Sequence, residues 1–380
     1  MSGKARFPDV IVMAVMLAGC VAPATQRAPI DPELAAREAE KQQDLAVAEW
    51  IGQQNRLAGV SHRLLTGAVT LCGERVRPMI GVYFLGAPDS DPDLQKAFNR
   101  YNGHSDEIHI VGVVEGSPAA AAGVEPGYAL VTLGGWRVPT GKGAVEETFE
   151  KLGEVLRVGE PVELVLNKLG DRKVVTIVPV AGCDYGVLVA DQEVVNAYAD
   201  GDQVVITKGM MRFAQSDTEL ANVVAHEIAH NVMGHIEAKR TNVLAGAGVG
   251  LIFDILAAAA GVNTQGEFSK IGAQAGRGAY SQEFEAEADY VALYIMANAG
   301  MDVSDTPNFW RRMAVAHPAS IQTNHASSHP STPERFLGLE NTVAEIARKR
   351  ASGAPLTPEM KVEPAVRSAK PSRDTPDYPE

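Results

Sequence analysis

The sequence is poor in cysteine, in aromatic residues and in positive charge. Three of its 380 residues are Cys, which is too few for a disulfide-rich scaffold. Lys and Arg number 34 against 47 Asp and Glu, so the formal net charge is −13 and no basic surface for nucleic acid is predicted. Hydrophobic residues (46%) and charged residues (21%) occur at the levels of folded proteins, which excludes a disordered or fibrous chain. No uninterrupted apolar run is typical of a membrane-spanning helix.

The N-terminus has the pattern of a secretory leader. Lys4 and Arg6 precede an apolar stretch over residues 10–18, which is too short to span a bilayer. The stretch runs into Leu-Ala-Gly-Cys, ending at Cys20, which resembles a bacterial lipobox. We therefore expect a signal peptide over 1–19 and a lipidated Cys20 as the first mature residue; a plain signal peptide is the alternative. Val21, rather than Asp, resembles the pattern sorted to the outer membrane, so the expected location is its periplasmic side, in a Gram-negative bacterium.

The two remaining cysteines, Cys72 and Cys183, form an even pair in an oxidising compartment. They flank residues 73–182, so a disulfide between them would hold together the two ends of an inserted domain. Two buried free thiols are the alternative.

Composition and periodicity divide the rest of the chain. Residues 20–77 are predicted to be a Pro-containing tether followed by a helix from Glu33 to about Leu71. Residues 78–182 alternate as short strands, the first over 80–85, with one helix over 144–157, and residues 86–106 are predicted to be a loop insertion. A mainly helical domain is expected over 183–345 and a disordered, Pro-rich tail over 346–380.

The second of these segments resembles a PDZ domain of the bacterial protease-associated type. The resemblance rests on Val-Val-Glu-Gly-Ser-Pro-Ala at 113–119 and on Pro126-Gly127, while Tyr128 stands where that family usually has Asp. PDZ domains bind extended peptides, often C-termini, by adding a strand to a sheet edge. The resemblance implies a peptide-binding loop near Ile80, Gly81 and Val82. A spacer of PDZ shape without peptide affinity is the alternative.

The strongest motif is His226-Glu227-Ile228-Ala229-His230. Ser216, with Glu219 three residues later, predicts a helix start upstream. On a helix, His226 and His230 project from one face a turn apart and can reach one metal ion. Glu227 is offset from them, as a general base would be. An ordinary amphipathic helix with two surface histidines is the alternative.

A catalytic zinc ion needs three protein ligands and an open position. Glu285 is the candidate third ligand, in the run Glu-Phe-Glu-Ala-Glu-Ala-Asp at 283–289. Asp289 is four residues later, shares its helix face and could accept a hydrogen bond from a ligating imidazole. Glu283 and Glu287 fall on other faces and are expected to be solvated charges.

Together these motifs are similar to those of the gluzincin peptidases that include the CAAX prenyl endopeptidases, the HtpX membrane proteases and the BepA-type periplasmic proteases. Further matches, in the same order, are residues 195–199, 206–209, His235, and Ser328-His329-Pro330 followed by Arg335. The resemblance covers about residues 184–345, with Gln282 where members commonly have Arg. It implies one Zn²⁺ per chain, held by His226, His230 and Glu285, with Glu227 as general base in peptide-bond hydrolysis.

His329 is the candidate for a further catalytic role. It could stabilise the tetrahedral oxyanion, or it could occupy the open zinc position and keep the enzyme latent. A solvent-exposed histidine in a Ser/Pro-rich loop is the alternative.

Residues 243–262 are mostly Ala, Gly, Leu, Ile and Val, with Asp254 as the only charge, and are long enough to span a bilayer. They lie between His230 and Glu285, which must meet at one metal, so a single crossing is excluded. Asp254 would add about 3 kcal/mol to the cost of insertion. We expect a helical hairpin that covers the active-site cleft or rests on a nearby membrane; packing in the protein core is the alternative.

The predicted fold class is α+β, a mainly helical zincin-type metallopeptidase domain plus a β-rich PDZ domain. The predicted function is a lipid-anchored zinc endopeptidase that hydrolyses misfolded or mis-assembled envelope proteins and recruits chain ends through the PDZ domain. The alternative is an envelope assembly factor or chaperone-like binder with latent protease activity. Expected partners are unfolded envelope proteins, peptide C-termini and the membrane, and no nucleic acid.

Overall fold

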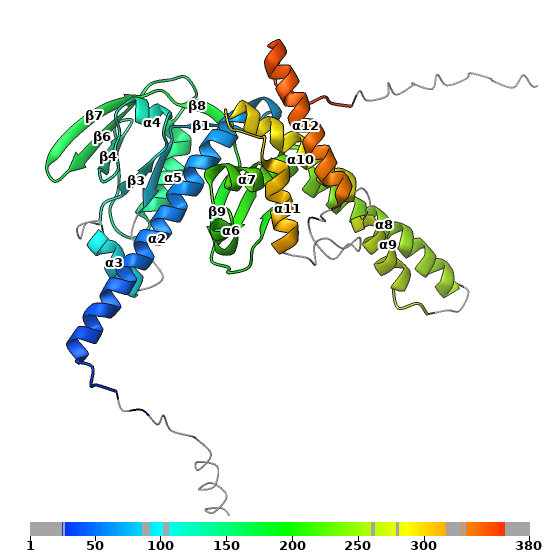
Figure 1. Ribbon diagram of the computed structural model, residues 1–380, viewed down its shortest axis with the longest axis horizontal. Helices are drawn as coiled ribbons and strands as arrows, with labels where there is room; N and C mark the ends of the chain where they lie inside the picture. Colours follow the sequence, from blue (N-terminus) through cyan, green and yellow to red (C-terminus); the bar gives the residue numbers. More distant parts are fainter. Residues whose placement is uncertain are drawn as a thin grey trace, which may run out of the picture.

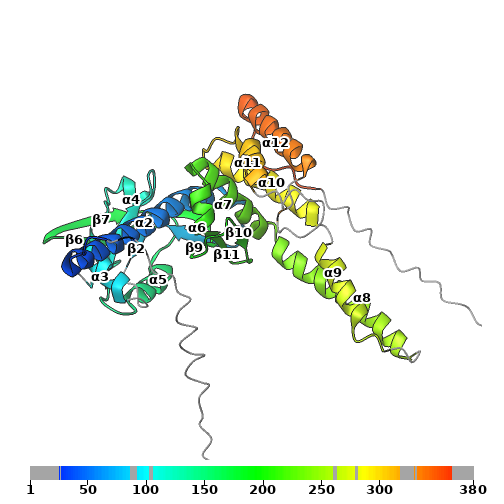
Figure 2. The ribbon, with the colours of Figure 1, turned by 60° about the horizontal axis from the view of Figure 1, so that its bottom comes forward.

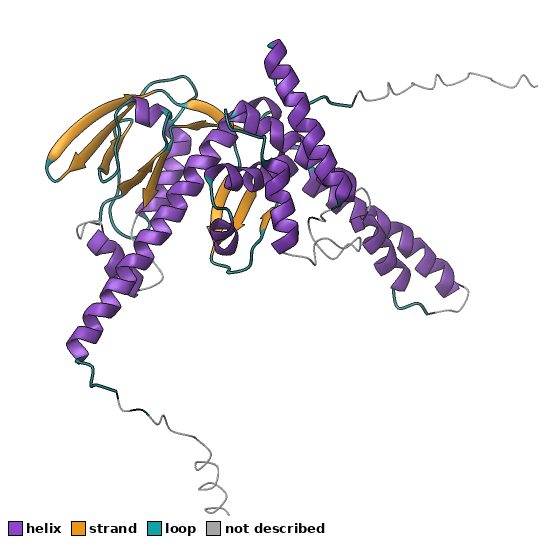
Figure 3. Ribbon diagram, in the orientation of Figure 1, coloured by secondary structure: helices purple, strands orange, loops and turns teal. Residues whose placement is uncertain are grey.

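The fold mixes helices and sheets, as the predicted α+β class requires (Figure 3). The computed structural model describes residues 25, 27–85, 92–101, 106–259, 263–278, 281–316, 329 and 332–361. The predicted leader, Cys20 and residues 362–380 lie outside this part of the chain.

A single long helix, α2 (Pro32–Gly67), runs beside both halves of the molecule (Figure 1). The Asp31 side chain caps its start by accepting from the Glu33 amide, and Pro32 occupies the first turn, where no amide is needed. Its N-terminal half packs Val47 and Ile51 against α3 (Pro92–Tyr101) and the β-rich part. Its C-terminal half belongs to the core of the helical part.

The β-rich part contains a sheet whose strands are ordered β2-β3-β4-β6-β7 and pair antiparallel, with β5 added to β4 as a hairpin. A separate two-stranded ribbon pairs β1 with β8, where the chain enters and leaves this part. The strands are β1 (Val76–Met79), β2 (Val82–Leu85), β3 (His109–Val113), β4 (Ala129–Leu133), β5 (Trp136–Arg137), β6 (Val162–Lys168), β7 (Asp171–Ile177) and β8 (Val180–Cys183). The helices are α3 (Pro92–Tyr101), α4 (Pro118–Ala121) and α5 (Ala144–Val155).

Two details here differ from the sequence-based expectation. Helix α3 occupies part of the segment predicted as a loop, because it buries Ala97 and Phe98 against α2, a tertiary contact that composition does not reveal. The strand expected over 80–85 begins only at Val82. Gly81 has φ of +77° and breaks the strand, and a Cβ there would lie 2.1 Å from Ser117 Cβ, so no larger residue fits.

The helical part surrounds a three-stranded sheet of order β10-β11-β9, in which β11 pairs parallel with β9 and antiparallel with β10. A 3-10 turn, η1 (Val69–Leu71), follows α2. The remaining elements are β9 (Gly186–Ala190), β10 (Ala197–Ala199), β11 (Gln203–Thr207), α6 (Lys208–Phe213), α7 (Asp217–Val232), α8 (His235–Ala259), α9 (Glu267–Gly278), α10 (Ser281–Asn298), α11 (Thr306–Ala316) and α12 (Pro333–Ser352).

Helices α8 and α9 pack side by side and project away from the rest of the molecule (Figures 1 and 2). Residues 243–259 therefore form one continuous helix, and the second arm of the hairpin is α9 rather than part of 243–262. Among the described residues, His235–Ala258 is long and apolar enough to cross a membrane, with a mean hydropathy of 1.7 and 11% of that window buried. This exposure rules out the alternative of core packing.

The C-terminal boundary lies later than expected. Helix α12 extends to Ser352, and the chain beyond it folds back: the Asn298 side-chain amide donates to the Leu356 carbonyl, and the Glu359 backbone amide donates to the Tyr290 hydroxyl. The prediction of disorder from residue 346 is therefore wrong for residues 346–361. Leu356 anchors this segment on the core, although its surrounding sequence is Pro-rich.

Cys72 and Cys183 form a disulfide, with their Cα atoms 5.7 Å apart and a separation of 111 positions in sequence. Cys183 is the last residue of β8 and pairs in register with Val76, the first residue of β1. The bond thus closes the β1–β8 ribbon at the point where the β-rich part joins the helical part.

We expect that replacing both Cys72 and Cys183 by Ala lowers the free energy of unfolding by about 2–4 kcal/mol, because the unfolded chain loses a long cross-link. Denaturant unfolding of the oxidised protein, the reduced protein and the double variant measures this. Reduction should destabilise the native chain and leave the variant unchanged. Equal stability of all three would contradict a structural disulfide, as would free alkylation of both thiols without reduction.

Candidate metal centre and active site

Helix α7 carries the histidine motif through the middle of the helical core. The Ser216 side chain accepts from the Glu219 amide and starts the helix, and the Glu219 carboxylate accepts from the Gln215 amide. Apolar neighbours such as Val223 and Ile228 bury the helix on several sides. His226, Glu227 and His230 are themselves only 1–2% exposed, so the motif is not a pair of surface histidines.

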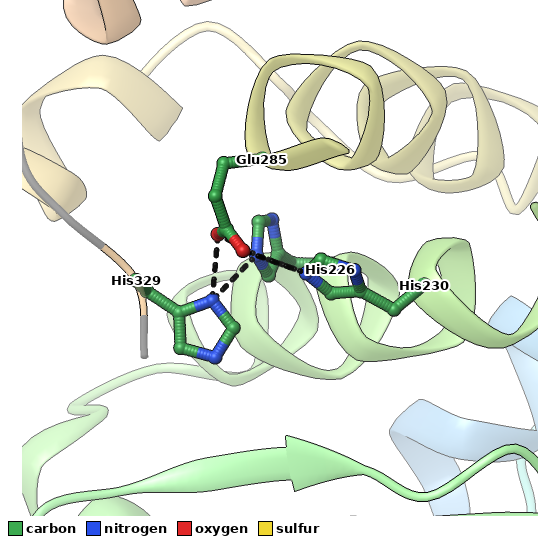
Figure 4. A group of neighbouring side chains, drawn as sticks. All are labelled: His226, His230, Glu285 and His329. Atoms are coloured by element: carbon green, nitrogen blue, oxygen red, sulfur yellow. Dashed lines mark hydrogen bonds and ion pairs between the residues drawn. The ribbon is translucent and has the colours of Figure 1, made fainter. Parts of the chain in front are cut away.

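Helix α10 brings Glu285 to the same point, 55 residues after His230 in the sequence. Its carboxylate oxygens lie 3.3 Å from His226 Nε2 and 3.5 Å from His230 Nε2, and the two Nε2 atoms are 3.2 Å apart (Figure 4). The three predicted ligands, which come from two helices packed against each other, therefore converge on one point.

His329 completes the group. Its Nδ1 lies 2.7 Å from Glu285 Oε2 and 3.2 Å from His226 Nε2, so four ligand atoms lie within 4.8 Å of one another (Figure 4). Its Nε2 lies 3.4 Å from Glu227 Oε1. His329 is thus at the site and not in a solvent loop, between the candidate base and the candidate ligands. Ser328 and Pro330 lie outside the described residues.

The donor set fits a metal ion. Ligand atoms at tetrahedral positions about 2.0–2.1 Å from a zinc ion lie about 3.3 Å from one another. The separations of His226 Nε2 from His230 Nε2 (3.2 Å) and from Glu285 Oε2 (3.3 Å) match this value, while the 3.5 Å contact of His230 is to the other carboxylate oxygen, Oε1. Glu285 Oε1 is buried and makes no hydrogen bond among the described residues, and the Lys239 ammonium lies 3.6 Å from it. A buried carboxylate needs a positive charge nearby, which a bound metal ion would supply together with Lys239.

Asp289 orients the first imidazole. Its Oδ1 lies 2.9 Å from His226 Nδ1, so that His226 Nε2 faces the ligand group. Both Asp289 oxygens accept from Arg335, at 2.5 and 2.8 Å, and this ion pair is buried. The Arg335 guanidinium also stacks 4.3 Å from the centre of the Trp310 ring, which lies 5.4 Å from the His226 ring. The sequence indicated Asp289, but neither the Arg335 pairing nor Trp310.

A second chain of contacts orients the other imidazole. His230 Nδ1 lies 2.9 Å from His235 Nδ1, and His235 Nε2 lies 2.8 Å from Glu287 Oε2. If His230 ligates through Nε2, its Nδ1 carries the proton and donates to His235. His235 must then carry its own proton on Nε2 and donate it to Glu287. Glu287 is therefore more than the expected solvated charge: its side chain is 39% exposed, but it also pairs with His235, which the first turn of α8 supplies.

Burial and charge compete at these groups. Burial acts to lower the pKa of His226, but the Asp289 and Glu285 carboxylates outweigh it and raise that pKa to about 9. Burial lowers the pKa of His230 to about 3. Burial acts to raise the pKa of Glu285, yet the surrounding histidines outweigh it and hold that pKa below its usual range. These directions describe the metal-free group and favour an ionised carboxylate ready to bind a cation.

A sheet edge and a cavity lie beside the helices that carry the ligand group. Strand β10 is at an edge of its sheet and contacts α7, and the Asn231 side chain ties the end of α7 to this sheet by accepting from Gly201 and donating to Gln203. A cavity of about 420 Å³ lies between α10 and α12, with Glu285, Asp289 and Gln282 in its wall. Gln282, which stands where the resembling family commonly has Arg, is exposed and carries no charge to this cavity.

The predicted peptide-binding residues lie elsewhere, in the β-rich part. The carbonyls of Ile80 and Gly81 accept from Ala119 and Val114, so this loop is fixed against α4. Val82 begins β2, the edge strand of the main sheet. These three residues border a groove of about 670 Å³ that is also lined by α5 and α2. They are thus grouped together, but away from the metal-ligand group.

Residues 178–343 match the model of Peptidase family M48. This range contains all four residues of the candidate metal centre, together with Glu227, Asp289 and Arg335. The match supports a metal-dependent endopeptidase in this part of the chain.

Relatives with similar sequences are also named as proteases. The mitochondrial metalloendopeptidase OMA1 of Arabidopsis thaliana is 29% identical over 167 residues, covering 43% of this chain and 33% of that protein. The putative beta-barrel assembly-enhancing protease of Vibrio cholerae is 33% identical over 174 residues, covering 42% and 36%. The beta-barrel assembly-enhancing protease of Yersinia pestis is 30% identical over 158 residues, covering 39% of this chain and 32% of that protein. The chain thus spans about a third of the length of these three relatives.

Among solved structures, the HtrA3 PDZ domain with a phage-derived ligand has a TM-score of 0.21 and 18% identity, over 28% of this chain and 88% of that one. A score this low does not define a shared fold.

We expect Glu287→Leu to weaken zinc binding about 10- to 100-fold, because His235 loses the acceptor that sets its tautomer and, through it, that of His230. Competition with a calibrated chelator measures the affinity. Glu283→Leu is the matched control, since Glu283 is on the same helix but exposed. Equal loss in both variants, or none in Glu287→Leu, would contradict the proposed relay.

Proposed function

We propose that this chain is a zinc-dependent endopeptidase that hydrolyses peptide bonds in extended or unfolded chains. The observation that carries the proposal is the convergence of His226, His230 and Glu285 at contacts suited to one ion, with Glu227 buried beside them. The match to Peptidase family M48 supports the same reaction class.

His226, His230 and Glu285 would hold the zinc, which, when bound, supplies a Lewis acid and lowers the pKa of a water molecule towards neutrality. Glu227 follows His226 directly on α7 and is aimed at the same point, within 3.4 Å of His329. We assign it the role of general base, which takes a proton from the attacking water and passes it to the leaving amine. Asp289 and the His235–Glu287 pair are positioning residues for the two imidazoles.

Substrate alignment is assigned to the edge strand β10. An extended peptide can add to a free sheet edge by main-chain hydrogen bonds, which places its carbonyls in regular order without selecting a sequence. Strand β10 is short, lies against α7 and pairs through only one of its edges in the described structure. This arrangement suits a protease that accepts many unfolded chains.

Recruitment is assigned to the β-rich part, as a PDZ-like domain. Its edge strand β2, its helix α5 and the loop at Ile80, Gly81 and Val82 border one groove, which is the arrangement that adding a peptide strand requires. We propose that this groove binds C-termini of envelope proteins.

The cellular setting is part of the same proposal. The lipobox-like sequence ending at Cys20 supports a lipid-anchored protein on the periplasmic side of the outer membrane. The Cys72–Cys183 disulfide fits an oxidising compartment. Two relatives are named beta-barrel assembly-enhancing protease, and we propose misfolded or mis-assembled envelope proteins as substrates here.

A second candidate function is supported by His329. With its Nδ1 2.7 Å from Glu285 and 3.2 Å from His226, His329 occupies the fourth position of the ligand group, which a hydrolytic zinc site must keep open. A chain in this state would bind polypeptides as an assembly factor and cleave only when His329 moves away. The alternative role, in which His329 donates to the oxyanion, uses the same position next to Glu227.

Glu227→Gln should lower the rate of β-casein hydrolysis about 10²- to 10⁴-fold while zinc content stays unchanged, because only the general base is lost. Chelation of the wild type should also abolish hydrolysis, and added zinc should restore it. Glu237→Gln, an exposed glutamate on α8, is the matched control and should retain full activity. Hydrolysis by Glu227→Gln at the wild-type rate would refute the mechanism.

The same assay with His329→Ala decides between the two roles of His329. Faster hydrolysis than in the wild type identifies His329 as the group that keeps the site closed. Slower hydrolysis identifies it as the oxyanion donor. A wild type that binds peptide but cleaves none, with an active His329→Ala, supports the assembly-factor function.

A further inference from the structure

The outer side of helix α8 carries large apolar side chains that no other part of the described structure covers. Leu251, Ile252, Phe253, Ile255 and Leu256 are each 53–60% exposed. In both views of the molecule, the α8–α9 hairpin extends away from the two cores (Figures 1 and 2). An apolar surface of this kind marks an interaction site.

The hairpin has its small residues inside and its large residues outside. A Cβ on Gly250 would lie 2.0 Å from the Phe268 carbonyl oxygen, and one on Gly272 would lie 2.0 Å from that of Gly246, so the two backbones touch. Water-soluble helix pairs bury their large apolar residues between the helices. The reverse arrangement, with small residues at the contact, is typical of helices packed in lipid.

The hairpin also provides hydrogen-bond donors for the one charged side chain within it. Between residues 241 and 266 the only ionisable side chain is Asp254. Its carboxylate faces α9 and accepts from the Thr264 hydroxyl, from the Phe268 amide, and from both the amide and the hydroxyl of Ser269, at 2.5–3.2 Å. Because four protein donors already satisfy the Asp254 carboxylate, it does not depend on hydrogen bonds from water. It therefore does not oppose the transfer of the outer side of α8 from water into lipid.

The breadth of the apolar surface favours lipid over a protein partner. At about 100° per residue, the large apolar positions from Leu244 to Leu256 cover roughly 200° of the helix circumference, twice the stripe that a helix presents to a protein core. Phe268 and Ile271 of α9 extend this surface, since the Phe268 ring lies 6.1 Å from that of Phe253.

The hairpin is not apolar on every side. The exposed pair Glu267–Lys270, with N and O atoms 2.8 Å apart, gives α9 a polar flank. Helix α9, with 12 residues, is also only about 18 Å long and too short to cross a hydrocarbon core of about 30 Å. The hairpin therefore suits the lipid–water interface and not a crossing.

We propose that the α8–α9 hairpin lies in the interface of a lipid bilayer, with the outer side of α8 among the acyl chains and Glu267 and Lys270 in water. Because α8 begins at His235, three residues after α7 ends, this docking connects the metal-binding helix to the membrane through α8. The inference depends neither on hydrolysis nor on lipidation of Cys20.

Bromolipid quenching tests it on the full chain. The Phe253→Trp variant is reconstituted into vesicles of phosphatidylethanolamine and phosphatidylglycerol, with and without brominated phosphatidylcholine, and the wild-type fluorescence is subtracted. We expect the added fluorescence to fall at least about twofold with brominated lipid, because residue 253 reaches the acyl region. Leu337→Trp, on an equally exposed position of α12, is the control and should not be quenched.

A triple variant, Phe253→Trp with Ile252→Glu and Leu256→Glu, should lose the quenching while its thermal unfolding stays unchanged, since all three positions are exposed. Equal emission of Phe253→Trp in both vesicle types would overturn the proposal. A second outcome would also overturn it. If, without lipid, the protein had twice the expected mass and the tryptophan at 253 were shielded from iodide quenching, a second copy of the chain would cover α8. Phe253→Trp combined with Glu227→Gln should be quenched as strongly as Phe253→Trp alone. Failure of the membrane proposal is therefore distinguishable from failure of the proposed hydrolysis.

Discussion

The structure depends on one constraint: the Glu285 carboxylate, only 3% exposed, must share a buried site with the imidazoles of His226 and His230. An ionised group in such a place costs several kcal/mol unless a cation or donors compensate it. The surrounding contacts are arranged to hold the two imidazoles facing that carboxylate. Asp289 with Arg335 fixes one ring, and the His235–Glu287 pair fixes the other. The site is therefore preorganised by pairs of oppositely charged or hydrogen-bonded groups on α7, α8, α10 and α12.

The second organising element is α2, because it belongs to the cores of both parts of the molecule. The disulfide closes the neighbouring β1–β8 ribbon, so the β-rich part is joined to the helical part by a helix and a cross-link and not by a loose linker. The groove beside β2 is lined by α2 and also by Gly186 and Val187 of β9. A peptide bound there would lie against the sheet whose other edge strand, β10, contacts the metal-binding helix.

Much of the site could be predicted from the sequence because its geometry is local. The spacing of His226 and His230, and of Glu285 and Asp289, places each pair on one helix face whatever the tertiary structure. The contact of Glu287 with His235 could not be predicted, since it depends on how α8 leaves α7. Helix α3 and residues 346–361 are likewise ordered by contacts with α2 and with the core. The pairing of the apolar run that begins at residue 243 with α9 likewise required the structure.

The central claim is that one metal ion is held by His226, His230 and Glu285, which explains the buried carboxylate and assigns Glu227 its role. The most direct measurement is X-ray absorption at the zinc edge of the purified chain, together with zinc content. The account predicts one zinc per chain with nitrogen and oxygen ligands at about 2.0–2.1 Å, and loss of that zinc in Glu285→Ala. A native chain without bound zinc, or a Glu285→Ala variant that retains zinc with unchanged affinity and ligand distances, would contradict it.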